Sequence, residues 1–137
     1  MSRLIFASHG GLSKGMEDSV SMIVGDLAKN VETYSLLPGQ NPEDFYQEIL
    51  KEAKESEEQI VILCDIKGGS VHTALSKLAV LDNVMVFSGM NMGLVLDAVM
   101  KGLNGKLELA EANDLIEAAK DGMTVMNGIT SEDDEDF

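Results

Sequence analysis

The stretch LIFASHGGL, residues 4–12, joins a short apolar run to a histidine and two glycines. The run from Leu4 to Ala7 is continuously apolar instead of alternating, which is typical of a strand covered on both faces in a parallel sheet. Apolar residues then recur at helical spacing from Leu12 onwards. The stretch therefore predicts a strand, a turn and a helix, with His9 at the carboxyl end of the strand.

The same alternation of apolar β-rich runs and helical periods continues along the 137 residues, without a repeat or a dividing linker. It predicts an α/β protein with an open, doubly wound and mostly parallel sheet. If the first strand is central, with the second on one side and the third on the other, the strand order is 2-1-3-4. We expect strands at residues 4–7, 31–37, 60–64 and 84–87, and helices at residues 12–27, 42–53, 71–81, 91–100 and 107–120.

Length and composition predict one domain, residues 1–130, because a chain of this size buries a single core. Residues 131–137 contain a run of five acids and are expected to form an acidic, disordered tail. Residues 123–126 can form a short last strand. No apolar run approaches the ~20 residues of a membrane span, and the first residues are too short for a secretory signal, so we expect a cytoplasmic protein.

The charge is strongly acidic: 24 acidic residues against 10 basic ones give a net charge of -14. Such a surface repels phosphate backbones and anionic lipids, which argues against nucleic-acid binding and against direct membrane insertion. It favours basic protein partners instead. The one cysteine, Cys64, lies inside an apolar run and is expected to be buried.

A candidate site follows from the expected topology. In an open α/β sheet, ligands bind outside the carboxyl ends of the strands where the winding reverses, here between strands one and three. His9 ends the first strand and Asp65 follows the third. A carboxylate beside an imidazole fixes its tautomer and leaves the other ring nitrogen as a nucleophile or base. We therefore expect His9 and Asp65 to form a catalytic pair.

An anion site is expected beside this pair. The segment Gly68-Gly69-Ser70 offers backbone N–H groups at a helix start and a hydroxyl, and the glycines after His9 can add further N–H groups. Walker and Rossmann glycine patterns are absent, and no histidine or cysteine pair has metal-ligand spacing, so we expect no cofactor and no metal. The alternative is purely structural: a strand-end histidine and a connecting turn with Ser70 as helix cap.

Four motifs occur in order along the chain: Ile5-Phe6-Ala7-Ser8-His9-Gly10, Leu37-Pro38-Gly39-Gln40-Asn41, Asp65-Ile66-Lys67-Gly68-Gly69-Ser70 and Ser88-Gly89-Met90-Asn91-Met92. With these motifs the sequence resembles the enzyme IIA component (EIIA) of the mannose/fructose/sorbose family of the bacterial phosphoenolpyruvate-dependent sugar phosphotransferase system. Beyond Leu103 the resemblance is one of pattern only.

The resemblance implies a phosphocarrier. His9 would accept a phosphoryl group from phosphohistidine on the carrier HPr and pass it to a IIB component of a sugar permease. Asp65 would be the hydrogen-bonded partner of His9. The family also implies a homodimer that exchanges a last short strand, which we assign to residues 123–129. We expect an acidic surface around the site to attract HPr. The phosphoryl group would be bound by Gly10, Gly68, Gly69 and Ser70.

The chain departs from the family pattern at Val71 and His72, where a proline and an aromatic residue are common. We expect His72 to be a surface residue in the first turn of its helix. Two alternatives stay open. One is the EIIA-like phosphoryl donor of dihydroxyacetone kinase, which shares the fold and the strand-end histidine. The other is a non-catalytic regulator that binds an anion without forming phosphohistidine.

Overall fold

The structure is a computed structural model that describes residues 2–102 and 105–128. Its sheet has four parallel strands in the order β2-β1-β3-β4, which confirms the predicted α/β fold and strand order. In this order the chain moves from β1 to one side and then to the other, so the winding reverses between β1 and β3. The strands are β1 (Arg3–His9), β2 (Glu32–Leu36), β3 (Ile60–Cys64) and β4 (Val84–Phe87).

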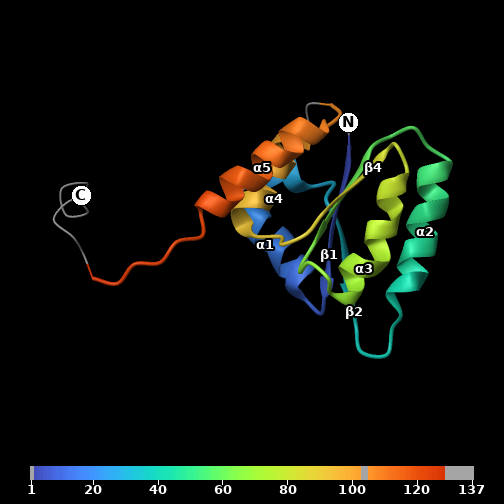
Figure 1. The fold of residues 1–137 in the computed structure, drawn as a ribbon, viewed down its shortest axis with the longest axis horizontal. Coiled ribbons are helices and arrows are strands. Elements are labelled where there is room, and N and C mark those ends of the chain that lie inside the picture. Colours follow the sequence, from blue (N-terminus) through green and yellow to red (C-terminus); the bar gives the residue numbers. More distant parts are fainter. Residues whose placement is uncertain (1, 103–104, 129–137) are drawn as a thin grey trace.

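Helices cover both faces of the sheet (Figure 1). One face carries α1 (Leu12–Val24), α4 (Met92–Gly102) and α5 (Leu109–Asp121), and the other carries α2 (Pro42–Lys54) and α3 (Ser70–Leu75). Alternate residues of β1 therefore enter two different cores. Leu4 and Phe6 pack beneath α1, α4 and α5, whereas Ile5 and Ala7 pack beneath α2 and α3. This double burial explains the continuously apolar run in the sequence.

Two predicted helices are interrupted. The helix expected over residues 12–27 ends at Val24, because Gly25 adopts a positive φ of 60° and a 3-10 turn, Gly25–Ala28, follows. Ile23 and Leu27, which continue the helical spacing of apolar residues in the sequence, are exposed. The helix expected over residues 71–81 is α3 followed by a second 3-10 turn, Ser76–Val80.

The short strand predicted at residues 123–126 is not formed in this single chain. Residues 123–128 lead away from the body of the molecule (Figure 1) and have no regular secondary structure. A strand requires a hydrogen-bonded neighbour, and α5 ends without bringing this segment beside the sheet. Exchange with a second chain is not tested by one chain and stays a prediction. Ile129 and the predicted acidic tail lie outside the described residues.

No helix in the described ranges has the length and apolarity needed to cross a membrane.

At the end of the sheet opposite His9, the buried Gln59 joins three segments. Its Oε1 accepts hydrogen bonds from the Ser2 hydroxyl at 2.6 Å and from the Leu107 N–H at 2.8 Å. Its Nε2 donates to the Leu107 carbonyl at 2.8 Å. The side chain therefore fastens the segment before α5 to the start of β3.

Replacing Gln59 by alanine should lower the free energy of unfolding by about 2–4 kcal/mol, because it leaves the buried polar groups of Leu107 without partners. Denaturant unfolding measures the change. The control is Gln40→Ala, which removes an exposed side chain that accepts one hydrogen bond from Leu37. Equal losses in the two variants would contradict the role assigned to Gln59.

Candidate phosphoryl-transfer site

The site lies at the carboxyl ends of β1 and β3. Ala7 of β1 pairs with Cys64 of β3 in the parallel register, so the next residues along each strand leave the sheet side by side. The Asp65 N–H continues the ladder by donating to the Ala7 carbonyl at 3.1 Å. His9 has the same strand parity as Ala7 and faces the α3 side of the sheet. The topology thus brings together the two residues that the sequence predicts as a pair.

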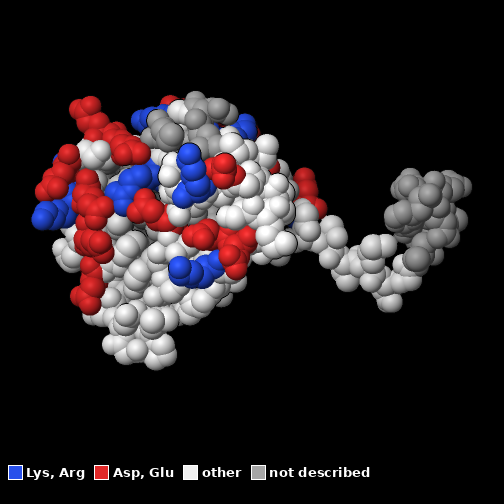
Figure 2. All heavy atoms as spheres, turned by 180° about the vertical axis from the view of Figure 1, so that it is seen from behind, with Lys and Arg blue, Asp and Glu red and all other residues white. Residues whose placement is uncertain are grey.

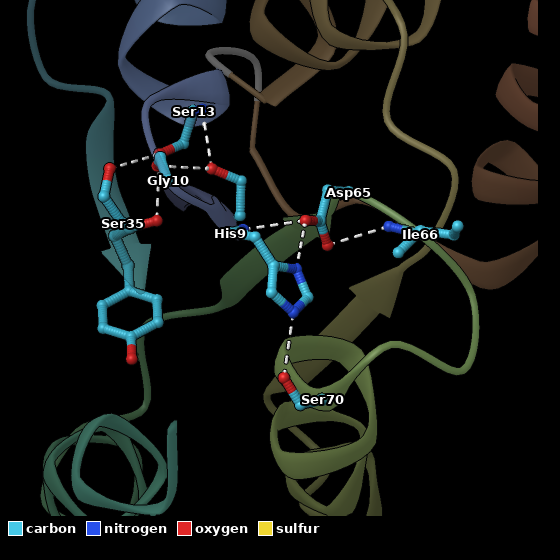
Figure 3. A network of polar contacts seen from close by, with 9 residues as sticks. His9, Gly10, Ser13, Ser35, Asp65, Ile66 and Ser70 are labelled. Carbon is cyan, nitrogen blue, oxygen red and sulfur yellow. Dashed lines mark hydrogen bonds and ion pairs between the residues drawn. The ribbon is translucent and has the colours of Figure 1, made fainter. Parts of the chain in front are cut away.

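Asp65 holds His9 at two points (Figure 3). Its Oδ2 accepts a hydrogen bond from the His9 backbone N–H at 2.8 Å and also lies 2.8 Å from the ring Nδ1. Its Oδ1 accepts from the Ile66 N–H at 2.9 Å. The Asp65 side chain is 8% exposed, whereas that of His9 is 48% exposed. The carboxylate is therefore fixed and shielded while the imidazole faces solvent.

The hydrogen bonds at Asp65 control its ionisation. Burial by itself would raise the pKa of Asp65, but hydrogen bonds from the His9 backbone, the His9 ring and the Ile66 backbone together lower this pKa below its usual value. An ionised carboxylate can only accept, so Nδ1 carries the proton of the neutral ring. The lone pair of the imidazole is then at Nε2.

Ser70, the first residue of α3, occupies the outward side of the ring. Its Oγ lies 2.9 Å from His9 Nε2, and with the proton on Nδ1 the hydroxyl must donate to the Nε2 lone pair. The helix cap is Gly69 rather than Ser70, so the purely structural role considered for Ser70 is not the one observed. A short side chain that rotates about one bond thus covers the nucleophilic nitrogen.

The glycines of the two loops shape the site. A Cβ on Gly69 would stand 2.8 Å from Ile66 Cγ2 and 3.3 Å from His9 Cε1, so only glycine lets this loop lie against the ring. Gly10 and Gly68 have positive φ angles of 55° and 81°.

The N–H groups of these glycines, predicted to bind phosphate, donate within the protein in this structure. Their acceptors are Leu36 O for Gly10, His72 Nδ1 for Gly68 and Ile66 O for Gly69. His72, expected to be a plain surface residue, is half-buried and accepts this hydrogen bond at 3.1 Å. The sequence contained one sign of this contact: His72 stands four residues after Gly68 at the start of a helix, a spacing at which a side chain can reach the preceding loop.

The loops around the site carry little charge. The connections that follow the four strands, residues 10–11, 37–41, 65–69 and 88–91, contain two charged residues, Asp65 and Lys67. In Figure 2 the charged side chains gather over the upper part of the visible face, and the lower end, where these loops lie, is largely white. Three apolar residues at this end are exposed to a similar extent: Leu12 (49%), Leu37 (50%) and Ile66 (59%). The loops themselves therefore carry little of the acidity, although Glu43 and Asp44 follow directly in the first turn of α2. The attraction of HPr by an acidic surface stays a prediction.

Comparison with known proteins finds a family match that spans residues 3–119. The family model EIIA-man, described as "PTS system fructose IIA component", matches residues 3–119. The sorbose-specific EIIA component of Klebsiella pneumoniae is 34% identical over 101 residues, covering 72% of this chain and 73% of that protein.

Solved structures share the fold. The mannose/sorbose-specific IIA subunit from Enterococcus faecalis has a TM-score of 0.78 at 22% identity, covering 94% of this chain and 97% of that one. A IIA protein associated with the fucose utilization operon of Streptococcus pneumoniae has a TM-score of 0.72 at 26% identity, covering 91% and 96% of the two chains.

The fold, the site and these matches define the class of this protein. It is an EIIA component, a phosphoryl carrier of the sugar phosphotransferase system. Within that class, the chain belongs to the mannose/fructose/sorbose family of EIIA components.

The lowered pKa of Asp65 predicts a stability difference that depends on pH. A carboxylate whose pKa is lower in the folded state stabilises the fold above its unfolded pKa of about 3.9, and this contribution disappears as the pH falls through the folded pKa. Asp65→Asn should therefore be less stable than wild type at pH 7, and the gap should narrow below about pH 4. Denaturant unfolding between pH 7 and pH 2 measures it. Asp18→Asn, at an exposed position of α1, is the control, and a gap that stays constant with pH would refute the prediction.

Proposed function

We propose that the protein accepts a phosphoryl group on Nε2 of His9 from phosphohistidine on HPr and transfers it to a histidine of a IIB component during sugar uptake. The observation that carries this proposal is the 2.8 Å contact between His9 Nδ1 and the ionised Asp65, on a ring that is half exposed. Membership of the EIIA family supports the partners. The geometry supports Nε2 as the accepting atom, because Nδ1 is engaged on the shielded side.

Phosphoryl transfer to His9 exchanges one P–N bond for another and needs no further reactant. The Nε2 lone pair forms the new P–N bond while the bond between phosphorus and the donor imidazole breaks, and the donor ring leaves with that electron pair. The Nδ1 proton stays on His9, where the Asp65 carboxylate stabilises the positive charge that develops on the ring. The Ser70 hydroxyl, displaced from Nε2, can donate to a phosphoryl oxygen. Transfer to the IIB histidine is the same exchange in the opposite direction.

The surface at the carboxyl ends of the strands suits partners that must bring one imidazole against another. Leu12, Leu37 and Ile66 supply exposed apolar contacts around His9, and the neighbouring loops carry almost no charge. HPr and the IIB component would therefore dock mainly through apolar burial at this end. The acidic residues outside these loops, such as Glu43 and Asp44 in the first turn of α2, would influence the approach of partners.

Replacing His9 by alanine should abolish phosphorylation, because no other group in the site has the nucleophilic nitrogen. The test is intact-mass analysis after incubation with phosphoenolpyruvate, enzyme I and HPr. Wild type should gain one acid-labile phosphoryl group, and so should His72→Gln, which removes the other histidine of the chain.

Each alternative function has its own outcome in this experiment. A label that persists in His9→Ala would move the acceptor to another residue. An unlabelled wild type, with a relay that labels a reference EIIA protein, would favour an anion-binding regulator or a donor for dihydroxyacetone kinase.

We further propose a homodimer in which residues 123–129 of each chain pair with the sheet edge of the other. Support comes from Met123, Val125 and Met126, which are 74%, 91% and 66% exposed on a segment that touches little of its own chain. β4 is an edge strand, and a groove beside it is lined mainly by apolar residues of β4 and α5, together with Ser88 and Asn113. Pairing there would cover both an open edge and an exposed apolar segment.

This dimer should be sensitive to charge on the C-terminal segment. Val125→Asp should convert the dimer to a monomer, because it places a carboxylate inside the apolar contact. Light scattering coupled to size exclusion measures the mass. Val80→Asp, at a site that is 83% exposed on a 3-10 turn, is the matched control and should stay dimeric. A monomeric wild type, or a dimeric Val125→Asp, would rule out this arrangement.

A further inference from the structure

Two serines near His9 in the chain, Ser8 and Ser13, are fully buried. The side chain of Ser8 points to the face of the sheet opposite that of His9, because side chains alternate along a strand. Figure 3 shows Ser13 and Ser35 on the α1 side of Gly10 and His9. Ser8 precedes His9 in β1 and lies opposite Ser35 of β2 in the parallel register. Ser13 belongs to the first turn of α1 and reaches down to both strands. We call Ser8, Ser13 and Ser35 the serine cluster. None of them belongs to the site described above.

The hydrogen bonds of the serine cluster form one directed network. The Ser13 N–H donates to Ser8 Oγ at 2.8 Å, and the Ser8 hydroxyl donates to the Gly10 carbonyl at 3.3 Å. The Ser13 hydroxyl donates to the Tyr34 carbonyl at 2.9 Å, so Ser35, 3.1 Å away, must be the donor to Ser13 Oγ. Every hydroxyl proton is then assigned, which fixes the three side chains relative to one another.

The cluster replaces an ordinary helix cap. The residue before α1 is Gly11, which has no side chain to accept a hydrogen bond from the first turn. Ser8 supplies that acceptor from the strand instead, and Ser13 anchors the same turn to β2. The glycine turn that follows His9 is thereby clamped between β1, β2 and the start of α1.

The clamp affects the orientation of His9 through the backbone of the residues next to it. Gly10, the next residue, is held at its N–H by the Leu36 carbonyl and at its C=O by the Ser8 hydroxyl. Because side chains alternate along a strand, fixing Ser8 toward α1 fixes the direction in which His9 leaves toward α3. The ring itself is hydrogen-bonded at its two nitrogens, to Asp65 and Ser70.

We propose that the serine cluster, with Ser13 at its centre, consists of positioning residues for His9. It keeps the imidazole aligned between Asp65 and Ser70, so that Nδ1 stays protonated and Nε2 stays directed outward. The effect on phosphoryl transfer rests on the function proposed above, whereas the effect on the ring does not.

The test compares Ser13→Ala with Ser2→Ala. Ser2 is also a buried serine, and its hydroxyl donates to Gln59 at 2.6 Å, but it lies at the other end of β1. Both variants lose one buried hydroxyl. Two quantities are measured: the tautomer of His9, from the nitrogen-15 shifts of its imidazole, and the rate of phosphorylation by HPr. His72→Gln assigns the two histidine signals.

Ser13→Ala should populate both His9 tautomers and slow phosphorylation by about tenfold or more, because small misplacements of a reacting group are costly. Ser2→Ala should keep one tautomer and change the rate by less than about twofold. Ser35→Ala should show a smaller effect in the same direction, and Ser35→Thr, which keeps the hydroxyl, should restore wild-type behaviour.

The proposal is overturned if Ser13→Ala matches Ser2→Ala in both measurements. If Ser13→Ala does not fold, Ser35→Ala decides: wild-type tautomer and rate in that variant overturn the proposal equally. A wild type that takes no phosphoryl group defeats the proposed function alone, since the imidazole spectra still report whether the cluster positions the ring.

Discussion

The Asp65 carboxylate is the contact on which the site depends. It accepts hydrogen bonds from the His9 backbone N–H, from the His9 ring and from the Ile66 N–H. It thereby joins the ends of β1 and β3 and fixes the tautomer of the imidazole. The same hydrogen bonds that overcome the cost of its burial keep it ionised. The same group therefore serves both the structure and the chemistry, because an ionised carboxylate accepts these three hydrogen bonds more strongly than a neutral acid would.

The two faces of the sheet contribute differently to His9. On the α3 side, glycines let the loop after β3 approach the ring closely, and Ser70 meets Nε2. On the α1 side, buried hydroxyls hold the backbone that carries the ring. The His9 side chain thus gains its orientation from both directions while it stays 48% exposed. This arrangement supports the proposed role of His9 as the phosphoryl acceptor, in which donor and acceptor reach the same nitrogen.

The distribution of charge separates general acidity from the site. A net charge of -14 describes the chain as a whole, but the loops at the carboxyl ends of the strands carry Asp65 and Lys67 alone. Apolar side chains lie exposed around His9 instead. A net negative charge disfavours binding to other anionic surfaces, and under the proposed function apolar burial at this end of the sheet supplies the contact with partners.

The sequence by itself determined the sheet and its central pair. Continuous apolar runs at residues 4–7 and 60–64 predict strands covered on both faces, and the strand order then places His9 beside Asp65. Only the tertiary structure decided where α1 ends, which glycine N–H groups are already engaged, and that Ser8, Ser13 and Ser35 meet on the α1 side of the sheet. Periodicity reports the burial of each element separately. Contacts among side chains from three elements depend on strand register and on the rotation of a helix about its axis, which no local pattern records.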